Sequence, residues 1–242
     1  DSHSEPIIYT AATESRQSTP STLILDSPLV FLDTDGGDWI PENYEGDYSG
    51  FVPLRRALAM SVNVVSVNIT QKLGIEYVIK YMAKLLRMDK SVAARRIRRD
   101  YSIALGSVEV SPLELTRAYA IIANGGRDVV PFYIRHVKDR DGNILENREE
   151  EVRKILESEE KDGSIQILKP ETAQIMISLM RSVINGGTGG AAGCGRPAAG
   201  KTGTTSSWKD AWFVGFTPQL TTGVWVGYDR LGMSLGPGAG LV

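Results

Sequence analysis

Apolar residues recur at helical spacing along much of the chain. One buried helical stripe, ending near Gly74, is predicted by the intervals of three or four residues between Leu54, Leu58, Val62, Val65 and Ile69. The same kind of pattern predicts helices over residues 6–15, 75–87, 112–123 and 169–184. Three of these helices have a proline at or next to their first position, where its missing N–H costs nothing.

Strand patterns concentrate in the second half of the chain. Residues 211–216 and 221–228 are rich in β-branched and aromatic side chains, and the turn residues between them predict a hairpin. Residues 131–137 are predicted to form another strand, followed by a glycine-containing turn and a return strand that starts at residues 144–145. Helices come first and are then mixed with antiparallel strands, which indicates the α+β class.

Two further stretches lack a regular pattern. Residues 33–50 are rich in Gly, Asp and Asn, which predicts a structured loop. Residues 146–162 are heavily charged and are expected to be a solvated excursion.

Composition narrows the class of protein. The chain has 242 residues, of which 42% are apolar and 23% charged, with a net charge of -2. This is ordinary for a globular domain and gives no electrostatic reason to expect nucleic acid or an anionic membrane as partner. The basic run at residues 95–99 is interpreted as a solvated helix face. Cys194 is alone, so an internal disulfide is impossible, and every apolar run is shorter than the roughly 18 residues that span a bilayer.

Lys201 lies in a segment that fits two incompatible motifs. Residues 195–202 satisfy the phosphate-loop pattern of glycine, four residues, then Gly-Lys-Thr. A phosphate loop needs a buried strand before it and a helix after it, so that N–H groups converge on the anion. Neither is predicted here, and Pro197 interrupts the loop. A nucleotide-binding protein therefore stays only as a remote alternative.

The second motif is a Lys-Thr-Gly strand, which penicillin-binding proteins and β-lactamases use. Lys201-Thr202-Gly203-Thr204 leads directly into the predicted antiparallel strands. Gly203 would let a substrate backbone lie close to the strand. The two threonines would present hydroxyl groups, and Lys201 would supply a fixed positive charge.

Several longer stretches resemble the class A penicillin-binding proteins. Ser61-Val62-Asn63 stands where that family has Ser-x-Asn. The other similar stretches, in the family's order, are residues 41–46, 54–58, 104–114, 199–205 and 210–215. The resemblance implies a single transpeptidase domain over residues 1–242, truncated at both ends relative to the full protein. It also implies the fold shared with β-lactamases, in which helices flank an antiparallel sheet beside a mostly helical subdomain.

The resemblance further implies an acyl-serine mechanism without a metal or cofactor. Ser2 would attack the penultimate D-Ala carbonyl of a peptidoglycan stem peptide, and β-lactams would trap the same serine. Ser61 would pass a proton to the leaving group and Asn63 would position the substrate amide. Lys201, Thr202 and Thr204 would hold the terminal carboxylate, with backbone N–H groups at Ser2 and just past Gly203 as the oxyanion hole.

The first motif departs from the family. The family has Ser-x-x-Lys before a proline, whereas this chain has Ser2-His3-Ser4-Glu5-Pro6. The lysine normally accepts the serine's proton, and a carboxylate at Glu5 would instead oppose the oxyanion and pair with Lys201. Three explanations stay open: an artificial junction at the start of the chain, a relative that binds without turnover, or a substitute role for Glu5.

Membership of this family implies a larger protein around the domain. An N-terminal membrane anchor and a glycosyltransferase module would precede it, and the domain would lie on the outer face of the bacterial cytoplasmic membrane, in the periplasm. Its partners would be stem peptides, β-lactams and other cell-wall synthesis proteins. The domain itself is expected to contact neither nucleic acid nor membrane.

Overall fold

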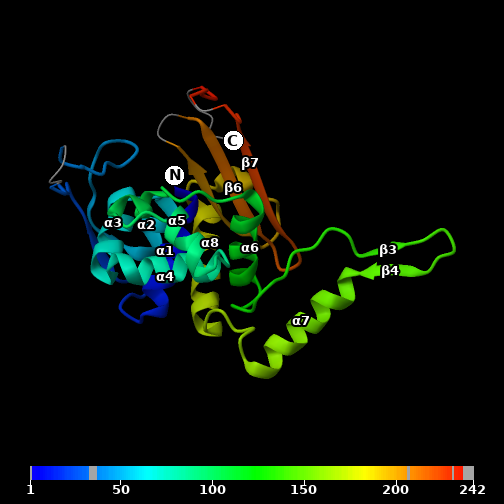
Figure 1. The fold of residues 1–242 in the computed structure, drawn as a ribbon. Helices are drawn as coiled ribbons and strands as arrows, with labels where there is room; N and C mark the ends of the chain where they lie inside the picture. Colours follow the sequence, from blue (N-terminus) through cyan, green and yellow to red (C-terminus); the bar gives the residue numbers. More distant parts are fainter. Residues whose placement is uncertain (1, 33–36, 206–207, 231, 237–242) are drawn as a thin grey trace.

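A computed structural model describes residues 2–32, 37–205, 208–230 and 232–236. Helix α1 (Glu5–Glu14) runs through the middle of the molecule, directly after the short 3-10 helix η1 (Ser2–Ser4) (Figure 1). Its residues 5–13 are all buried, so the helix has no solvent-facing side. A helix that is apolar nearly all round belongs in a core.

Short helices surround α1 on one side. They are α2 (Leu54–Met60), α3 (Asn63–Leu73), α4 (Ile75–Leu85), α5 (Lys90–Arg96) and the 3-10 helix η2 (Tyr101–Leu105). The prediction of one helix up to Gly74 was wrong in its middle, because the helix is interrupted at Ser61 and Val62. Ser61 adopts a left-handed conformation, with φ 55° and ψ 52°, and Val62 is extended. Neither conformation continues an α-helix.

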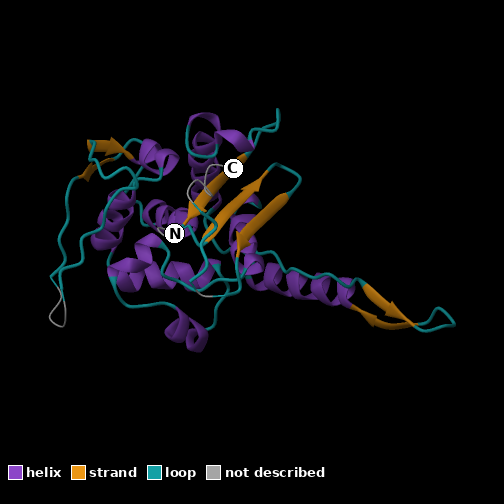
Figure 2. Cartoon of the chain, turned by 90° about the horizontal axis from the view of Figure 1, so that it is seen from above, coloured by secondary structure: helices purple, strands orange, loops and turns teal. Residues whose placement is uncertain are grey.

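A three-stranded antiparallel sheet covers the other side of the core, in the order β5-β6-β7. The strands are β5 (Ala199–Thr204), β6 (Asp210–Phe216) and β7 (Thr221–Gly227), so the predicted hairpin is confirmed. Helix α8 (Pro170–Gly186) packs against β5, and α6 (Pro112–Ala123) packs against β6 and β7. Seen from above, helices lie beside the three strands of this sheet (Figure 2). The 3-10 helix η3 (Gly190–Ala192) lies between α8 and β5.

Two small ribbons complete the strands. Strands β1 (Leu23–Asp26) and β2 (Gly50–Pro53) pair beside the helices and were not predicted. Strands β3 (His136–Lys138) and β4 (Ile144–Asn147) form a hairpin. The predicted strand over residues 131–137 is therefore right only at its last two residues, since residues 131–135 have no partner strand.

The charged stretch that was expected to be a solvated excursion is helix α7 (Arg148–Asp162). Val152 is its one buried residue. Acidic side chains occupy its first turn, where their negative charge interacts favourably with the helix dipole. Helix α7 carries the β3–β4 hairpin away from the body of the molecule, and the two together form an arm (Figure 1).

Candidate active site

Three side chains from distant parts of the chain meet at one point. The hydroxyl of Ser61 donates a hydrogen bond to Glu5 Oε1 at 3.0 Å, and Lys201 Nζ donates to Ser61 Oγ at 2.9 Å. Glu5 begins α1, Ser61 lies in the break between α2 and α3, and Lys201 lies on β5. Ser61, whose backbone is left-handed, therefore connects the helices to the sheet through the hydrogen bonds of its hydroxyl.

Glu5 and Lys201 form a buried ion pair. Both side chains are 0% exposed, and Lys201 Nζ lies 3.5 Å from Glu5 Oε2. Burying either charge alone would be costly, so each depends on the other. Burial lowers the pKa of Lys201, while the Glu5 carboxylate opposes that shift. Burial also raises the pKa values of the Tyr9 and Tyr119 phenols, and the charge of Glu5 adds to both shifts.

Strand β5 holds the motif against the core. Its register places Lys201 opposite Val214 and Gly203 opposite Trp212. Gly200 is required there, because a Cβ would lie 2.9 Å from the Val214 carbonyl oxygen. Lys201 Nζ also donates to the Thr202 carbonyl at 2.9 Å.

The two threonines of the motif are half-buried on β5. The hydroxyls of Thr202 and Thr188 lie 2.8 Å apart, and the backbone N–H of Thr188 donates to the Ala59 carbonyl at 3.0 Å. Thr188 therefore links the strand to α2. Sequence reasoning missed Thr188, because it sits in a glycine-rich run that carries no motif.

Asn63 is the first residue of α3 and lies two residues from Ser61. Its Nδ2 donates to the Glu42 carbonyl at 2.9 Å, and the backbone N–H of Val64 donates to Asn43 Oδ1 at 3.2 Å. The loop before β2 is thus tied to the Ser-x-Asn segment. Glu42 and Asn43 belong to the family-like stretch at residues 41–46, although their contacts could not be predicted from it.

The position of Ser2 follows from that of the 3-10 helix η1, which contains it. It lies in η1, three residues before Glu5, and η1 packs against β5 and β6. The ring of His3 stacks near Trp212 at 5.2 Å between centroids, and its carbonyl accepts a hydrogen bond from the Tyr119 hydroxyl at 2.7 Å. These contacts hold η1 beside the strand that carries Lys201.

The phosphate-loop alternative is wrong. Lys201 and Thr202 lie inside β5, which starts at Ala199 and pairs with β6 along its whole length. A phosphate loop would need a helix directly after the lysine. The loop that follows β5 leads instead to another strand.

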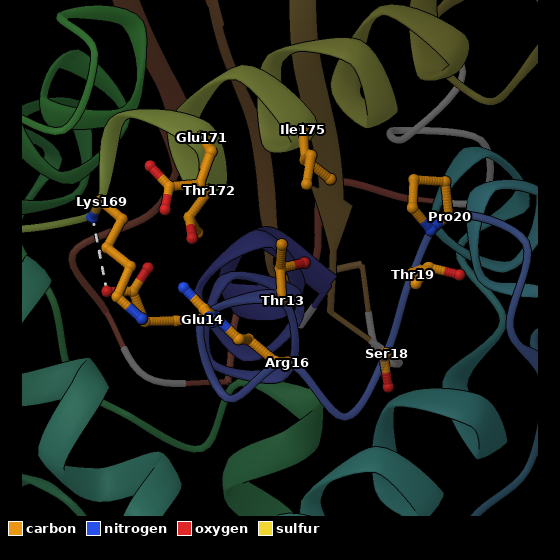
Figure 3. A pocket seen from close by; sticks show the side chains of 10 residues that line it. All are labelled: Thr13, Glu14, Arg16, Ser18, Thr19, Pro20, Lys169, Glu171, Thr172 and Ile175. Atoms are coloured by element: carbon orange, nitrogen blue, oxygen red, sulfur yellow. Dashed lines mark hydrogen bonds between the residues drawn. The ribbon is translucent and has the colours of Figure 1, made fainter.

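A cavity of about 310 Å³ lies at the C-terminal end of α1, whereas Glu5 lies at its N-terminal end (Figure 3). There the backbone N–H of Lys169 donates to Glu14 Oε1 at 3.4 Å, which caps the start of α8. Glu14 ends the 10-residue helix that Glu5 begins, so this cavity lies about 15 Å from the buried ion pair. We interpret it as a structural junction between α1 and α8.

The described residues contain neither a bilayer-spanning helix nor a cluster of metal-ligating side chains. Among residues 2–32, 37–205, 208–230 and 232–236, no helix is both long and apolar enough to span a bilayer. Within the same residues, His, Cys, Asp and Glu side chains form no group of three or more that could hold a metal ion.

Comparison with known proteins gives a consistent result. Residues 5–234 match the family model described as the penicillin binding protein transpeptidase domain. The chain is 40% identical over 226 residues to penicillin-binding protein 1A of Aquifex aeolicus, which covers 93% of this chain and 28% of the relative. It is 36% identical over 230 residues to penicillin-binding protein 1A of Neisseria meningitidis, covering 93% of this chain and 27% of that protein.

The chain therefore spans little more than a quarter of these relatives. Among solved structures, penicillin-binding protein 1A from Haemophilus influenzae matches 99% of this chain and 40% of its own, with a TM-score of 0.83 and 28% identity. This match confirms the expected α+β penicillin-binding fold. The chain belongs to the penicillin-binding protein transpeptidase domain family.

Proposed function

We propose that the chain is the D,D-transpeptidase domain of a class A penicillin-binding protein, which cross-links peptidoglycan stem peptides and is acylated by β-lactams. The contact of Lys201 Nζ with Ser61 Oγ at 2.9 Å carries this proposal. It joins two motifs that lie 140 residues apart, in the way a shared proton-transfer site requires.

Ser2 is the nucleophile in this proposal. Its oxygen attacks the penultimate D-Ala carbonyl, the peptide C–N bond breaks, and the departing D-Ala amine receives a proton. Ser61 can deliver that proton, because its hydroxyl lies between the Lys201 ammonium and the Glu5 carboxylate. The Ser2 oxygen gives up its hydroxyl proton in this first half of the reaction. In the second half an amine of another stem peptide takes the acyl group from Ser2, and the proton that the amine loses restores the Ser2 hydroxyl.

The remaining motif residues hold the substrate. Thr202 and Thr204 offer hydroxyl groups to the terminal carboxylate, and Gly203 lets the substrate backbone approach β5. Asn63 orients the substrate amide from the helical side. Backbone N–H groups at Ser2 and after Gly203 stabilise the tetrahedral oxyanion.

The Glu5–Lys201 pair favours a second candidate, a module that binds stem peptides or β-lactams but turns them over poorly. The 3.5 Å ion pair with Glu5 neutralises the charge of Lys201. That charge would otherwise attract the substrate carboxylate. The carboxylate of Glu5 also disfavours a nearby oxyanion. We therefore propose that acylation is slow in this chain and that Glu5 is the cause.

Labelling with a fluorescent penicillin separates the two candidates. We expect slow labelling of the wild-type chain, labelling faster by about 100-fold in Glu5→Lys, and none in the matched Ser2→Ala variants. Labelling that appears only with Glu5→Lys shows that Glu5 prevents acylation in the wild-type chain and favours the second candidate. Labelling that survives Ser2→Ala, or is missing from every variant, contradicts the proposed site.

The setting of the domain follows from the same proposal. Residues 1–242 form one domain of a longer protein, which has a membrane anchor, a glycosyltransferase module and a position on the outer face of the cytoplasmic membrane. Other cell-wall synthesis proteins are its partners. The gene sequence upstream of Asp1 tests this, because it should encode both the anchor and the module.

A further inference from the structure

One hydroxyl group outside the motifs contacts the motif strand. Thr188 is exposed and stands between Gly187 and Gly189, just past the C-terminal end of α8. Its Oγ1 lies 2.8 Å from Thr202 Oγ1, and either hydroxyl can be the donor of this hydrogen bond. Thr202 is half-buried on β5, one position after Lys201.

The backbone around Thr188 is fixed to two helices. The N–H of Thr188 donates to the Ala59 carbonyl in the last turn of α2 at 3.0 Å. The N–H of Gly189 donates to the Val183 carbonyl of α8, also at 3.0 Å. A Cβ on Gly187 would lie only 2.2 Å from the Ala59 carbonyl oxygen, so only glycine lets the chain pass this close to α2. The Thr188 side chain is therefore held at a defined place beside β5.

This anchoring connects Thr188 to both halves of the proposed site. Ala59 precedes Ser61 by two residues, and Thr202 follows Lys201 directly. Ser61 and Lys201 are themselves joined by the 2.9 Å hydrogen bond between Oγ and Nζ. The end of α2 and the motif strand thus share a second link, which passes through Thr188 and ends on a hydroxyl of the motif.

The direction of the Thr188–Thr202 hydrogen bond matters, because a threonine hydroxyl has one proton to donate. A carboxylate accepts hydrogen bonds and donates none. Thr202 can therefore donate to the terminal carboxylate of a substrate only when its oxygen accepts the proton of Thr188. Hydrogen bonds to a charged group are the stronger kind, so a bound carboxylate favours this direction.

We propose that Thr188 is a positioning residue, which turns the Thr202 hydroxyl toward the carboxylate of the acyl donor. This role rests on the proposed function, because it assumes that Thr202 holds that carboxylate. It favours donors that carry a free carboxylate next to the bond that breaks. A donor in which the same group is esterified gains little from Thr188.

Two thioester donors test this role in the Glu5→Lys variant. They are N-benzoylglycyl thioglycolate, which has a free carboxylate, and its methyl ester, which has lost that charge. In both, Ser2 displaces the thiol, and water then hydrolyses the acyl-enzyme. Thr188→Val removes the hydroxyl and keeps the shape of the side chain. We expect it to lower kcat/KM about tenfold for the acid and less than about twofold for the methyl ester.

Further variants separate positioning from structural support. Thr188→Ser keeps a hydroxyl and should restore most of the rate with the acid. Thr202→Val should show the same selectivity for the acid, and adding Thr188→Val to it should cost little more, because Thr188 acts through Thr202. Thr222→Val is the matched control, since Thr222 is exposed on β7, which β6 separates from β5. It should change neither rate.

The outcomes distinguish this role from the proposed function. Unchanged rates in Thr188→Val, equal losses with both donors, or additive losses in the double variant would overturn the positioning role alone. If the Glu5→Lys variant turns over neither donor, the proposed function fails, and the role of Thr188 fails with it.

Discussion

Lys201 and Glu5 carry opposite charges that the fold removes from water. Each side chain is fully buried, and each has the other as its counter-ion at 3.5 Å. Taking a charge out of water costs several kcal/mol, which the partner and the hydrogen bonds through Ser61 offset. The substitution of one partner should therefore cost more than the substitution of both.

Replacing Lys201 by methionine tests this at the level of single residues. Lys201→Met leaves a buried carboxylate with Ser61 as its donor, so we expect the free energy of unfolding to fall by about 3–5 kcal/mol. Glu5→Gln combined with Lys201→Met should recover most of that loss. Urea unfolding of the four proteins in the cycle measures the coupling. A loss in the double variant that equals the sum of the two single losses would show that the ion pair is not coupled.

Local signals in the sequence predicted some elements well and others not at all. Helix α6 was predicted at its observed bounds, because Ser111-Pro112 precedes it and Asn124-Gly125-Gly126 follows its end. The structure adds a capping box between Ser111 and Glu114. The break at Ser61 could not be predicted. The apolar spacing continues across it, and the contacts that Ser61 makes there are with Glu5 and Lys201, which lie far from it in the sequence.

The sequence predicted several residues of the candidate site but few of the contacts between them. Sequence motifs identified Ser61 and Lys201, and the charge of Glu5 predicted its pairing with Lys201. The short strands β1 and β2 and the contacts of Thr188 depend on segments that meet only in the folded chain. Local patterns carry no information about such meetings.

The end of α1 contains a left-handed residue that is not glycine. Arg16 has a φ of 60°, and its N–H donates to the Thr13 carbonyl at 3.0 Å, as at many helix ends where glycine is preferred. Arg16→Gly should raise the free energy of unfolding by about 0.5–1 kcal/mol, because glycine adopts this φ without strain. Thermal unfolding measures the gain, and Gln17→Gly should lower stability as the control. A loss in Arg16→Gly would contradict the strain.

Helix α6 links stability to pH. The Arg96 guanidinium, which hydrogen-bonds both oxygens of Glu114 at 2.8 Å, lowers the pKa of that carboxyl from 4.5 to about 2. Because the pKa of Glu114 is lower in the folded state than in the unfolded state, its carboxylate stabilises the fold fully above pH 4.5. This stabilisation is lost as the pH falls toward 2.

Glu114→Gln should therefore unfold more easily by about 1–2 kcal/mol at pH 7, with the difference from wild type vanishing near pH 2. Urea unfolding across this range tests it. A difference that is constant with pH would assign the loss to hydrogen bonding in the capping box instead of to charge. Arg98→Gln is a suitable control, because Arg98 pairs with Asp100 on the surface.

At the scale of the whole molecule, one buried carboxylate connects the body to the arm. Asp128 is 3% exposed and forms ion pairs with Arg87 at 3.0 Å and Arg117 at 3.1 Å. Arg87 also lies 3.8 Å from Glu159 of α7. These ion pairs fix the base of the arm, whereas in the part of the chain that the structure describes the β3–β4 hairpin forms no ion pair with the body.

The hairpin should be dispensable for the fold. Every residue of β3 is exposed, and of β4 only Asn147 is half-buried. The N–H of Glu149 donates to the Arg135 carbonyl at 3.1 Å, so the two ends of residues 136–147 lie close together. A two-glycine linker can therefore replace residues 136–146 without moving α7, because Asn147, whose side chain accepts a hydrogen bond from the N–H of Glu150, is kept as the helix cap.

We expect this excision to shift the melting temperature by less than about 3 °C, because exposed residues contribute little to stability. Val152→Asp is the matched control within the arm. It places a charge at the one buried position of α7 and should cost about 2 kcal/mol or more. Calorimetry of both variants makes the comparison. An excised protein that melts more than about 10 °C lower would mean that the hairpin stabilises the body, in conflict with its exposure.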